Sequence, residues 1–483
     1  MKEAKPTINY GRGFAWNLIF NFLTKITFAV VGIIIANQLG PGPVGIYALL
    51  TTIYNFADLM RDAGLKQAFY NDPEITPEKH RTYGRLAVTS GISFGLVMLA
   101  AAYPLALFYQ LPDLTWCMAM AALAVTLNSL SAIPTASLLK AGRFRDMGII
   151  ESAATFISAV IALILVKTGF GLFSLMMQLI TRSAVIWAAS YKLAPVEIKD
   201  HDREAVRPIM RLCMQLVATD LLWMMYSIAD MLLVPKVLGN VANGSYSWAK
   251  RLIAMPAELV FAPLHRTVTI AVGHRTDDKL ALGRAFSRSF SLALLLLLPL
   301  YFTLAFFAPI VVHTILRPDF YPAAAVLPIL CITEAARSMG AFAGTALVGG
   351  RYAQVPLIAW CLPYFVAGGM LYMNWGHLNL INIAWSFAAG MLAVNVFVIA
   401  SAFILLSAWR LERRKLLKSA LCAAMTAAVA WGLSRLPIPN WPSLITAAVA
   451  IPTLHLAIVG VFFGNHPGAF MSPSGLRKLR AAL

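Results

Sequence analysis

The stretch LGPGPVGIY at residues 39–47 recurs as LGNVANGSY at residues 238–246, with the Leu-Gly pair, the later glycine and the tyrosine at identical spacing. A second pair supports the repeat: LLKAGRF at 138–144 and ALVGGRY at 346–352. Each pair lies at equivalent points of two successive groups of six apolar stretches. Because six is an even number, the two groups have the same orientation in a bilayer, as in transporters built from two parallel repeats.

The rest of the chain is apolar enough for a membrane protein. Of its 483 residues 59% are hydrophobic and only 12% are charged, which no ordinary soluble domain matches. A spanning helix needs ~20 mostly apolar residues. The sequence therefore predicts an all-α polytopic membrane protein with about fourteen transmembrane helices, at residues 14–36, 44–61, 86–108, 116–139, 147–166, 170–189, 209–234, 246–270, 290–316, 322–347, 355–373, 380–406, 417–433 and 441–463.

The repeat divides this series of helices. We expect an N-terminal lobe with helices 1–6 at residues 1–208 and a C-terminal lobe with helices 7–12 at residues 209–409. Residues 410–483 then hold helices 13 and 14 and a basic cytoplasmic tail. The two six-helix lobes are expected to be related by a pseudo-twofold axis along the membrane normal.

Positive charge predicts the orientation. Almost all Lys and Arg residues outside the predicted spans lie at the termini or in the even-numbered loops. The odd-numbered loops hold only Lys167, Lys236, Arg317 and Arg435. The positive-inside rule therefore places both termini in the cytoplasm. The net charge of +18 reflects this topology and contact with membrane lipids. Nucleic acid is not an expected partner, because no basic soluble domain with aromatic residues is present.

The loops are too short for an enzyme domain. The outward loops have a few residues each, and the longest inward loops reach about twenty, too few for a separate core. Asp200-His201-Asp202 resembles the metal-binding D-x-D signature of sugar-nucleotide transferases, but it lies in a short loop between Lys199 and Arg203. We therefore expect neither a metal site nor catalytic residues. No ATP-binding P-loop motif occurs, so no cofactor is expected and transport must draw on gradients.

Ionisable residues inside the predicted spans are the candidate functional residues, because burying a charge in lipid is costly. They are Lys25, Arg61, Arg182, Lys250, Arg251 and Arg337, with Asp58, Asp62, Glu151, Asp220, Asp230, Glu258 and Glu334. Their near balance allows internal ion pairs. Arg61 is spaced for pairing with Asp58 on its own helix, and Arg337 for pairing with Glu334.

Four cations lie about halfway along their spans, too deep to reach the membrane surface: Lys25, Arg182, Lys250 and Arg251. They predict a water-filled, cation-lined central cavity that binds an anionic group, with Arg61 and Arg337 as further candidate binding residues. Candidate coupling or ion-pair residues are Asp58, Asp62, Asp220, Asp230, Glu258 and Glu334. The alternative is that the deep cations neutralise buried acids, including Glu151.

Several of these segments resemble the polysaccharide flippases (Wzx-type) of the multidrug/oligosaccharidyl-lipid/polysaccharide (MOP) exporter superfamily. Residues 39–47 resemble that family's LGPxxFGxY element, with Val44 where Phe is usual, and residues 62–65 its D-x-G-L turn. Residues 138–145 are similar to its ALLQRxxRF segment, and residues 244–256 to its G-x-Y-x-x-A-x-R-L…P stretch. Many such flippases have twelve spans. The extra pair of spans here resembles the related lipid II flippases.

This resemblance implies a function. The protein would be a bacterial inner-membrane flippase that moves an oligosaccharide on undecaprenyl pyrophosphate to the outer leaflet by alternating access, for O-antigen, capsule or exopolysaccharide. The implied partners are this lipid-linked substrate, membrane lipids and the polysaccharide polymerase and assembly machinery. Three alternatives stay open: a lipid II flippase, a cation-coupled multidrug exporter, which would need an acidic cavity, and a glycan polymerase or ligase, which would need a large outward loop.

Overall fold

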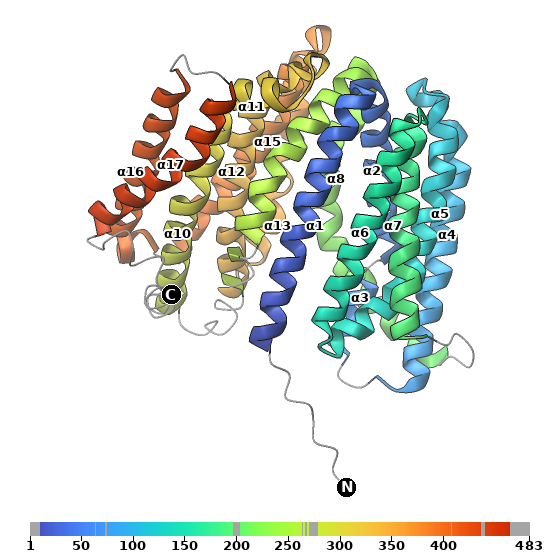
Figure 1. Ribbon diagram of the computed structural model, residues 1–483. Coiled ribbons are helices and arrows are strands. Elements are labelled where there is room, and N and C mark those ends of the chain that lie inside the picture. The colour runs from blue at the N-terminus through green and yellow to red at the C-terminus, as the bar shows by residue number, and fades with distance from the viewer. Residues whose placement is uncertain are drawn as a thin grey trace. The chain divides into compact units, whose positions relative to one another are not determined.

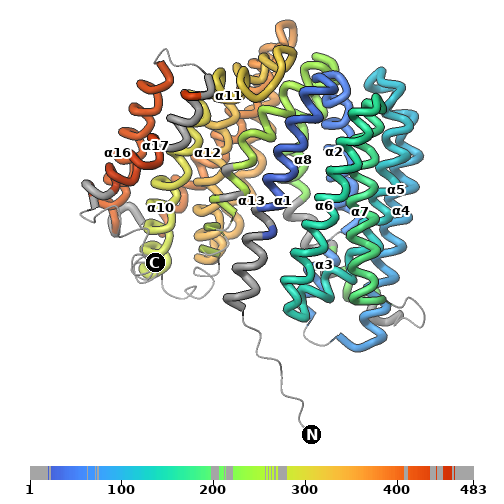
Figure 2. Tube along the Cα trace, viewed as in Figure 1, coloured from blue at the N-terminus to red at the C-terminus, as the bar shows by residue number. Residues whose placement is uncertain are grey.

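The computed structural model describes the backbone of residues 10–62, 64–72, 75–196, 203–262, 264–265, 268–269, 279–406, 408–435 and 440–463 (the ribbons of Figure 1). Figure 2 traces the same chain as a tube. The chain forms two compact units, Met1–Gly244 (unit 1) and Ser245–Leu483 (unit 2). Unit 1 extends past the predicted lobe boundary at residue 208, because it includes the first part of α8. The division into lobes 1–208 and 209–409 with a C-terminal extension stays a prediction.

Unit 1 consists of helices (Figure 1): α1 (Tyr10–Leu39), α2 (Pro41–Asp62), α3 (Leu65–Asn71), α4 (Pro77–Tyr109), α5 (Asp113–Lys140), α6 (Phe144–Lys167), α7 (Leu172–Leu193) and most of α8 (Arg203–Pro256). α5 is central, because it packs against α4, α7 and α2. α6 packs between α7 and α1.

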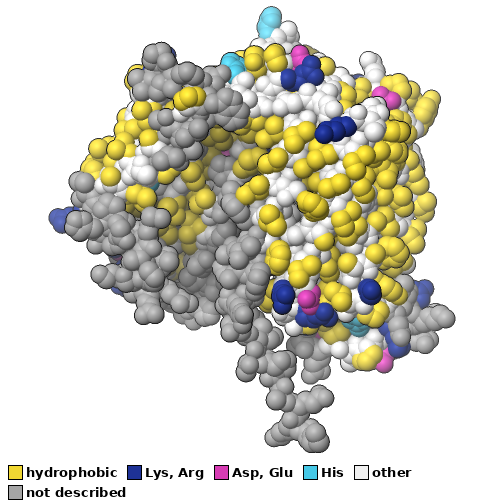
Figure 3. All heavy atoms as spheres, in the orientation of Figure 1, with side chains coloured by type: hydrophobic (Ala, Val, Ile, Leu, Met, Phe, Trp, Pro, Cys, Tyr) yellow, Lys and Arg dark blue, Asp and Glu magenta, His cyan; other side chains and the backbone are white. Residues whose placement is uncertain are grey.

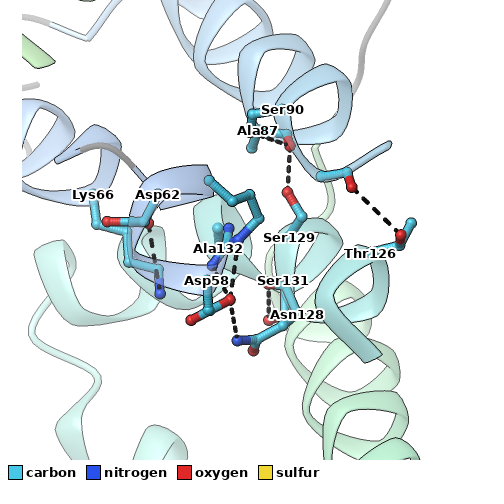
Figure 4. A network of polar contacts seen from close by, with 12 residues as sticks. Asp58, Asp62, Lys66, Ala87, Ser90, Thr126, Asn128, Ser129, Ser131 and Ala132 are labelled. Carbon is cyan, nitrogen blue, oxygen red and sulfur yellow. Dashed lines mark hydrogen bonds and ion pairs between the residues drawn. The ribbon is translucent and has the colours of Figure 1, made fainter. Parts of the chain in front are cut away.

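Small residues let α4 and α5 approach closely. A Cβ atom at Gly91 would lie 2.3 Å from the Ser129 Cβ, and one at Gly95 would lie 2.8 Å from the Thr126 hydroxyl. The Ser129 hydroxyl donates a hydrogen bond to the Ala87 carbonyl (Figure 4). Helices in lipid associate through such close backbone packing and interhelical hydrogen bonds, since lipid tails are as apolar as the side chains.

Unit 2 begins within α8 and continues through η1 (Ala257–Phe261), α10 (Lys279–Phe306), α11 (Ala308–Ile315), η2 (Pro318–Phe320), α12 (Pro322–Gly349), α13 (Gln354–Ala359), α14 (Leu362–Met373), η3 (Trp375–His377), α15 (Leu380–Leu405), α16 (Ala408–Ser434) and α17 (Asn440–Phe463). α10 packs against both α12 and α16, while α15 packs against α12 and α14. The last two helices, α16 and α17, pack against each other.

The helices have the length and composition of membrane spans. Among the described residues, ten helices are long and apolar enough to cross a bilayer, and two shorter apolar helices accompany them. The prediction of an all-α polytopic membrane protein is confirmed. Hydrophobic side chains cover the visible face of α6 and α7, and charged side chains lie towards its upper and lower edges (Figure 3). A lipid-facing surface requires this distribution.

Two predicted spans are each divided into two helices. Residues 290–316 cover the end of α10 and all of α11, which begins at Ala308. Residues 355–373 cover α13 and α14, which begins at Leu362. A proline occupies the first turn of both second helices. Proline is favoured there because its missing N–H group would have no partner in the first turn.

The predicted loop between spans two and three contains the short helix α3. Lys140 at the end of α5 donates hydrogen bonds to the backbone carbonyls of Phe69, at 3.0 Å, and Asp72. A cation is favourable beside the carbonyls that end a helix. The Phe69 ring packs edge-on against Tyr83 of α4. Lys140, part of the LLKAGRF segment, thus holds α3 against α4 and α5.

Each copy of the repeated Leu-Gly motif lies where the helical backbone is interrupted. Gly40 precedes α2 with φ 78°, and Gly239 interrupts α8 with φ 84°. Both angles lie in the left-handed region, which glycine adopts at no steric cost. The break at Gly239 separates predicted spans seven and eight, which otherwise run through one long helix. The two copies of the motif therefore share a glycine with a positive φ, at the offset that the sequence predicts.

The segments 138–144 and 346–352 both end a helix in the same way, but one residue out of register with the sequence alignment. The Arg143 N–H donates to the Leu138 carbonyl at 2.9 Å, and the Tyr352 N–H to the Leu347 carbonyl at 2.8 Å. These bonds are typical of the Schellman ending of a helix, in which one residue is left-handed. That residue is Gly142 after α5 and Arg351 after α12. The sequence alignment pairs Arg351 with Arg143, one residue further on.

Candidate functional site

Arg61 is held in an ion pair inside unit 1. Its side chain is 0% exposed, and its Nε and Nη2 donate to Asp58 Oδ1 at 3.1 and 2.8 Å. The Asn128 amide donates to the same oxygen at 2.9 Å (Figure 4). One turn further, Asp62 lies 3.8 Å from Lys66. Asp58 thus has the cationic partner at i+3 that its spacing predicts, and Asp62 has an unpredicted partner, Lys66, at i+4.

Unit 2 contains a second ion pair of the same spacing. Arg337 Nε donates to Glu334 Oε2 at 2.7 Å, and its Nη2 donates to the other carboxylate oxygen. The guanidinium also lies over the Phe261 ring, 5.1 Å from the ring centroid. Two parallel hydrogen bonds to one carboxylate are the strongest arrangement for an arginine ion pair. The pair is therefore a structural element of α12.

We expect Glu334→Gln to destabilise the protein by about 3 kcal/mol, because it leaves the Arg337 guanidinium largely buried without a counter-charge. The thermal unfolding midpoint of the purified protein measures this effect. The double variant Glu334→Gln/Arg337→Met should regain most of the lost stability, because it removes both charges. A single Glu334→Gln variant as stable as the wild type would contradict a structural ion pair.

Arg182 differs from Arg61 and Arg337. It lies in the middle of α7, roughly 15 Å of helix from either end. In the part of the chain that the structure describes, its guanidinium makes no hydrogen bond or ion pair. Its electrostatic neighbours are Glu151 of α6 and Tyr54 of α2, and the Tyr54 hydroxyl interacts with the adjacent Ser183. A charge at this depth must face protein, water or a ligand.

Lys25 of α1 has the same acidic neighbour. The Thr24 and Ser152 hydroxyls are 3.2 Å apart, joining α1 to α6 beside Lys25 and Glu151. Lys25 and Arg182 both act electrostatically on the Glu151 carboxylate. Unit 1 thus brings two of the four deep cations to one acid. This grouping of residues from α1, α6 and α7 is tertiary, so spacing along the chain could not predict it.

Lys250 and Arg251 lie on α8 beyond the break at Gly239. Lys250 Nζ is 5.8 Å from the centroid of the Tyr246 ring, and Arg251 Cζ is 5.1 Å from that of Trp248. Both rings are fully buried. Cations over aromatic faces are stabilised by the ring quadrupole, more strongly when water is excluded. Sequence analysis missed these partners, although their spacing of three and four residues on one helix could have predicted them.

The remaining acids have different environments. Asp230 is buried, and its carboxylate accepts a hydrogen bond from the Met231 N–H at 2.7 Å. Glu258 lies exposed in η1. The side chain of Asp220 and the whole of residues 200–202 lie outside the described residues. A coupling role for these acids stays a prediction. No cluster of metal-ligating side chains occurs among the residues that were placed.

A polar cluster in unit 2 was not predicted. The His265 Nε2 lies 2.9 Å from the Thr345 hydroxyl, and its ring stacks on Phe261 at 5.2 Å between centroids. The Tyr301 and Ser338 hydroxyls are 3.4 Å apart near the same helix, α12. His265 follows the π-helix η1, and such helical irregularities are frequent at functional sites. A lone histidine in an apolar span carries no sequence signal of this kind.

Comparison with known proteins decides the family. Residues 13–325 match the family described as polysaccharide biosynthesis protein. The chain belongs to this family. It is 24% identical over 277 residues to the amylovoran biosynthesis protein AmsL of Erwinia amylovora, covering 56% of this chain and 71% of that protein. It is also 24% identical over 307 residues to the succinoglycan biosynthesis transport protein ExoT of Rhizobium meliloti (strain 1021), covering 62% and 61%.

Solved structures show the same fold at low sequence identity. The lipid II flippase MurJ, in an inward closed conformation, has a TM-score of 0.71 at 13% identity and covers 95% of this chain and 99% of MurJ. An inward-facing multidrug resistance MATE family transporter of the MOP superfamily has a TM-score of 0.62, also at 13% identity, covering 80% and 96%. The protein therefore has the fold of MOP exporters.

Proposed function

We propose that the protein is a flippase that moves an undecaprenyl-pyrophosphate-linked oligosaccharide from the cytoplasmic to the outer leaflet by alternating access. The observation that carries this proposal is Arg182, a mid-membrane guanidinium with no direct partner among the described residues and with Lys25 as a second nearby cation. Positive charge at this depth that is not held in a direct ion pair suits an anionic group that passes through. A lipid-linked pyrophosphate is such a group, and polysaccharide biosynthesis needs it on the opposite leaflet.

The chemistry of the head group fits these residues. A pyrophosphate offers several acceptor oxygens, which a guanidinium binds through two parallel hydrogen bonds and an ammonium as a point charge. Arg182 and Lys25 supply these two kinds of donor in unit 1, and Lys250 and Arg251 supply them in unit 2. Tyr54 is an electrostatic neighbour of Arg182, but its ring is buried in the core of unit 1 and its hydroxyl interacts with Ser183. Arg61 and Arg337 are excluded from this role because carboxylates already bind them.

The alternatives are less well supported. A multidrug exporter for cationic drugs would need free acids in its cavity, whereas Asp58 and Asp62 are paired with Arg61 and Lys66. A lipid II flippase has this fold, but the relatives AmsL and ExoT carry names from exopolysaccharide pathways. A polymerase or ligase would need a large outward loop, and the predicted outward loops have only a few residues.

The proposal also covers the cellular location and the membrane topology of the protein. Many apolar helices and the relationship to membrane transporters make the protein a multi-pass membrane protein. The distribution of Lys and Arg supports a bacterial inner-membrane location with both termini in the cytoplasm. The lipid-linked substrate and membrane lipids would be its direct partners, and the polymerase and assembly machinery would act on the translocated product.

A deletion strain tests the function. Without the protein, the lipid-linked oligosaccharide should accumulate on the cytoplasmic leaflet, and the exported polysaccharide should fall to background. Leaflet location is measured by accessibility of the sugar to an impermeant oxidant or lectin in right-side-out and inverted vesicles. Accumulation on the outer leaflet would instead place the defect after translocation, as for a polymerase, and would contradict the proposal.

A further inference from the structure

Glu151 lies close to the predicted cytoplasmic end of unit 1, in the second turn of α6. It lies seven positions after Phe144, the first residue of that helix, a rise of roughly 10 Å. Three cations act electrostatically on its carboxylate: Arg182 of α7, Lys25 of α1 and Lys66 of α3. The acid is therefore placed between the predicted entry side and the deeper Arg182.

Close packing of α1 against α6 fixes this position. A Cβ atom at Gly148 would lie 2.6 Å from the Phe20 ring. One turn further along both helices, the Thr24 and Ser152 hydroxyls are 3.2 Å apart. Lys25 directly follows Thr24, and Glu151 directly precedes Ser152. The relation between the ammonium of α1 and the carboxylate of α6 is thus set by the helix crossing.

Glu151 differs from the acids that are held in ion pairs within unit 1 and unit 2. Asp58 and Glu334 each accept direct hydrogen bonds from an arginine. By contrast, the Glu151 carboxylate makes no hydrogen bond or ion pair in the part of the chain that the structure describes. Another titratable neighbour is Tyr70 of α3, where burial, then the charges of Asp62 and Glu151, raises the pKa of the phenol. Tyr70 therefore stays neutral, and the cations are the groups that respond to Glu151.

We propose, on the basis of the head-group site proposed above, that Glu151 is the resting counter-charge of Lys25 and Arg182 and competes with the anionic head group for them. In the empty protein, the carboxylate offsets part of the positive charge that a mid-membrane site could not otherwise tolerate. An arriving pyrophosphate has more charge and more acceptor oxygens, so it displaces this weak interaction. On release, the carboxylate again neutralises the cations.

As a consequence, the protein binds the anionic head group less tightly than Lys25 and Arg182 alone would allow. A transporter must release what it binds, and a built-in competitor weakens binding without removing any contact to the ligand. Removing the charge at Glu151 leaves Lys25 and Arg182 unchanged and deprives them of the competitor. Glu151→Gln keeps the size and shape of the side chain. We therefore expect this variant to bind an isoprenyl pyrophosphate about tenfold more tightly and to release it more slowly.

The test measures binding of farnesyl pyrophosphate to the purified full-length protein in lipid nanodiscs. Five proteins are compared: the wild type, Glu151→Gln, Glu151→Ala, Arg182→Ala and the control Asp146→Asn. Asp146 also lies on α6, but its ion pair with Arg143 is exposed, so its loss should not alter binding. Glu151→Ala is a second variant without the charge and should change affinity in the same direction. Thermal unfolding of each variant shows that it is folded.

The outcomes separate the two proposals. Tighter binding by both Glu151 variants, with loss of binding in Arg182→Ala, supports the competitor. Wild-type binding that Arg182→Ala abolishes, but that Glu151→Gln leaves unchanged or weakens, overturns the competitor and keeps the head-group site. No binding of farnesyl pyrophosphate by the wild type overturns the head-group site, and the competitor with it.

Discussion

Arg182→Ala is expected to reduce polysaccharide export about 100-fold while the protein still accumulates in the membrane. Two charge-assisted hydrogen bonds to a phosphate contribute about 3 kcal/mol together, and each 1.4 kcal/mol corresponds to a factor of ten. Stability should not change, because no hydrogen bond or ion pair to another described residue is lost. Export and membrane abundance are measured together in the deletion strain that carries the variant.

The conservative replacement shows which property of Arg182 matters. Arg182→Lys keeps the charge but loses the planar pair of donors, so we expect partial export, about tenfold below the wild type. Lys192→Ala is the matched control, since Lys192 lies exposed at the end of the same helix. Its export should match that of the wild type.

A structural role for Arg182 predicts a different pattern. If Arg182 served only to neutralise Glu151, then Arg182→Ala would strand a half-buried acid and lower membrane abundance. Adding Glu151→Gln would then restore both abundance and export. Recovery of this kind would contradict the head-group site. A stable, inactive Arg182→Ala protein that Glu151→Gln cannot rescue would support it.

Local patterns made part of this molecule predictable. Apolar length predicted the spans, because a helix in lipid must satisfy its backbone hydrogen bonds internally. The pairs Asp58–Arg61 and Glu334–Arg337 were predictable because residues three apart on a helix are neighbours. The breaks between α10 and α11 and between α13 and α14 were missed, since both sides of each break are apolar. The prolines in the first turns of α11 and α14 were the available signal.

Tertiary relations were not predictable. The common acidic neighbour of Lys25 and Arg182 lies on a third helix, and nothing in the spacing along the chain connects α1 and α7 to Glu151. The same holds for α3, a seven-residue helix whose position depends on hydrogen bonds from Lys140, which lies 71 and 68 residues further along the chain than their acceptors. Hydrophobic periodicity reports which residues are buried, but it does not report which helices meet.

The repeated motif leads to the second large effect, because its two copies contact each other. A Cβ atom at Gly45 would lie 1.7 Å from the Asn240 carbonyl oxygen, and one at Gly244 would lie 2.1 Å from that of Pro41. With the offset of 199 residues, Pro41 corresponds to Asn240 and Gly45 to Gly244. The contact of Gly45 with Asn240 is thus equivalent, through the repeat, to the contact of Gly244 with Pro41, as in an isologous interface. The Asn243 amide adds a hydrogen bond to the Gly45 carbonyl at 2.8 Å.

Gly45→Ala and Gly244→Ala are therefore expected to have large and similar effects. A methyl group at either position meets backbone atoms, which no rotamer change can move, so α2 and residues 240–244 must separate. Overpacking of this kind costs about 1–3 kcal/mol or more, and the Asn243–Gly45 hydrogen bond is weakened with it. Membrane abundance and thermal unfolding of the two variants should fall together, and export should fall with them.

Gly42→Ala provides the control on the same helix. A Cβ atom there would have only the Asn240 side-chain amide nearby, at 3.9 Å, which is ordinary contact. This variant should match the wild type in stability and export. If Gly45→Ala were tolerated as well, the close crossing would not be needed in the folded protein. If only one of the two glycines proved sensitive, the two copies of the motif would not be equivalent, and the local twofold relation would be only a similarity of backbone shape.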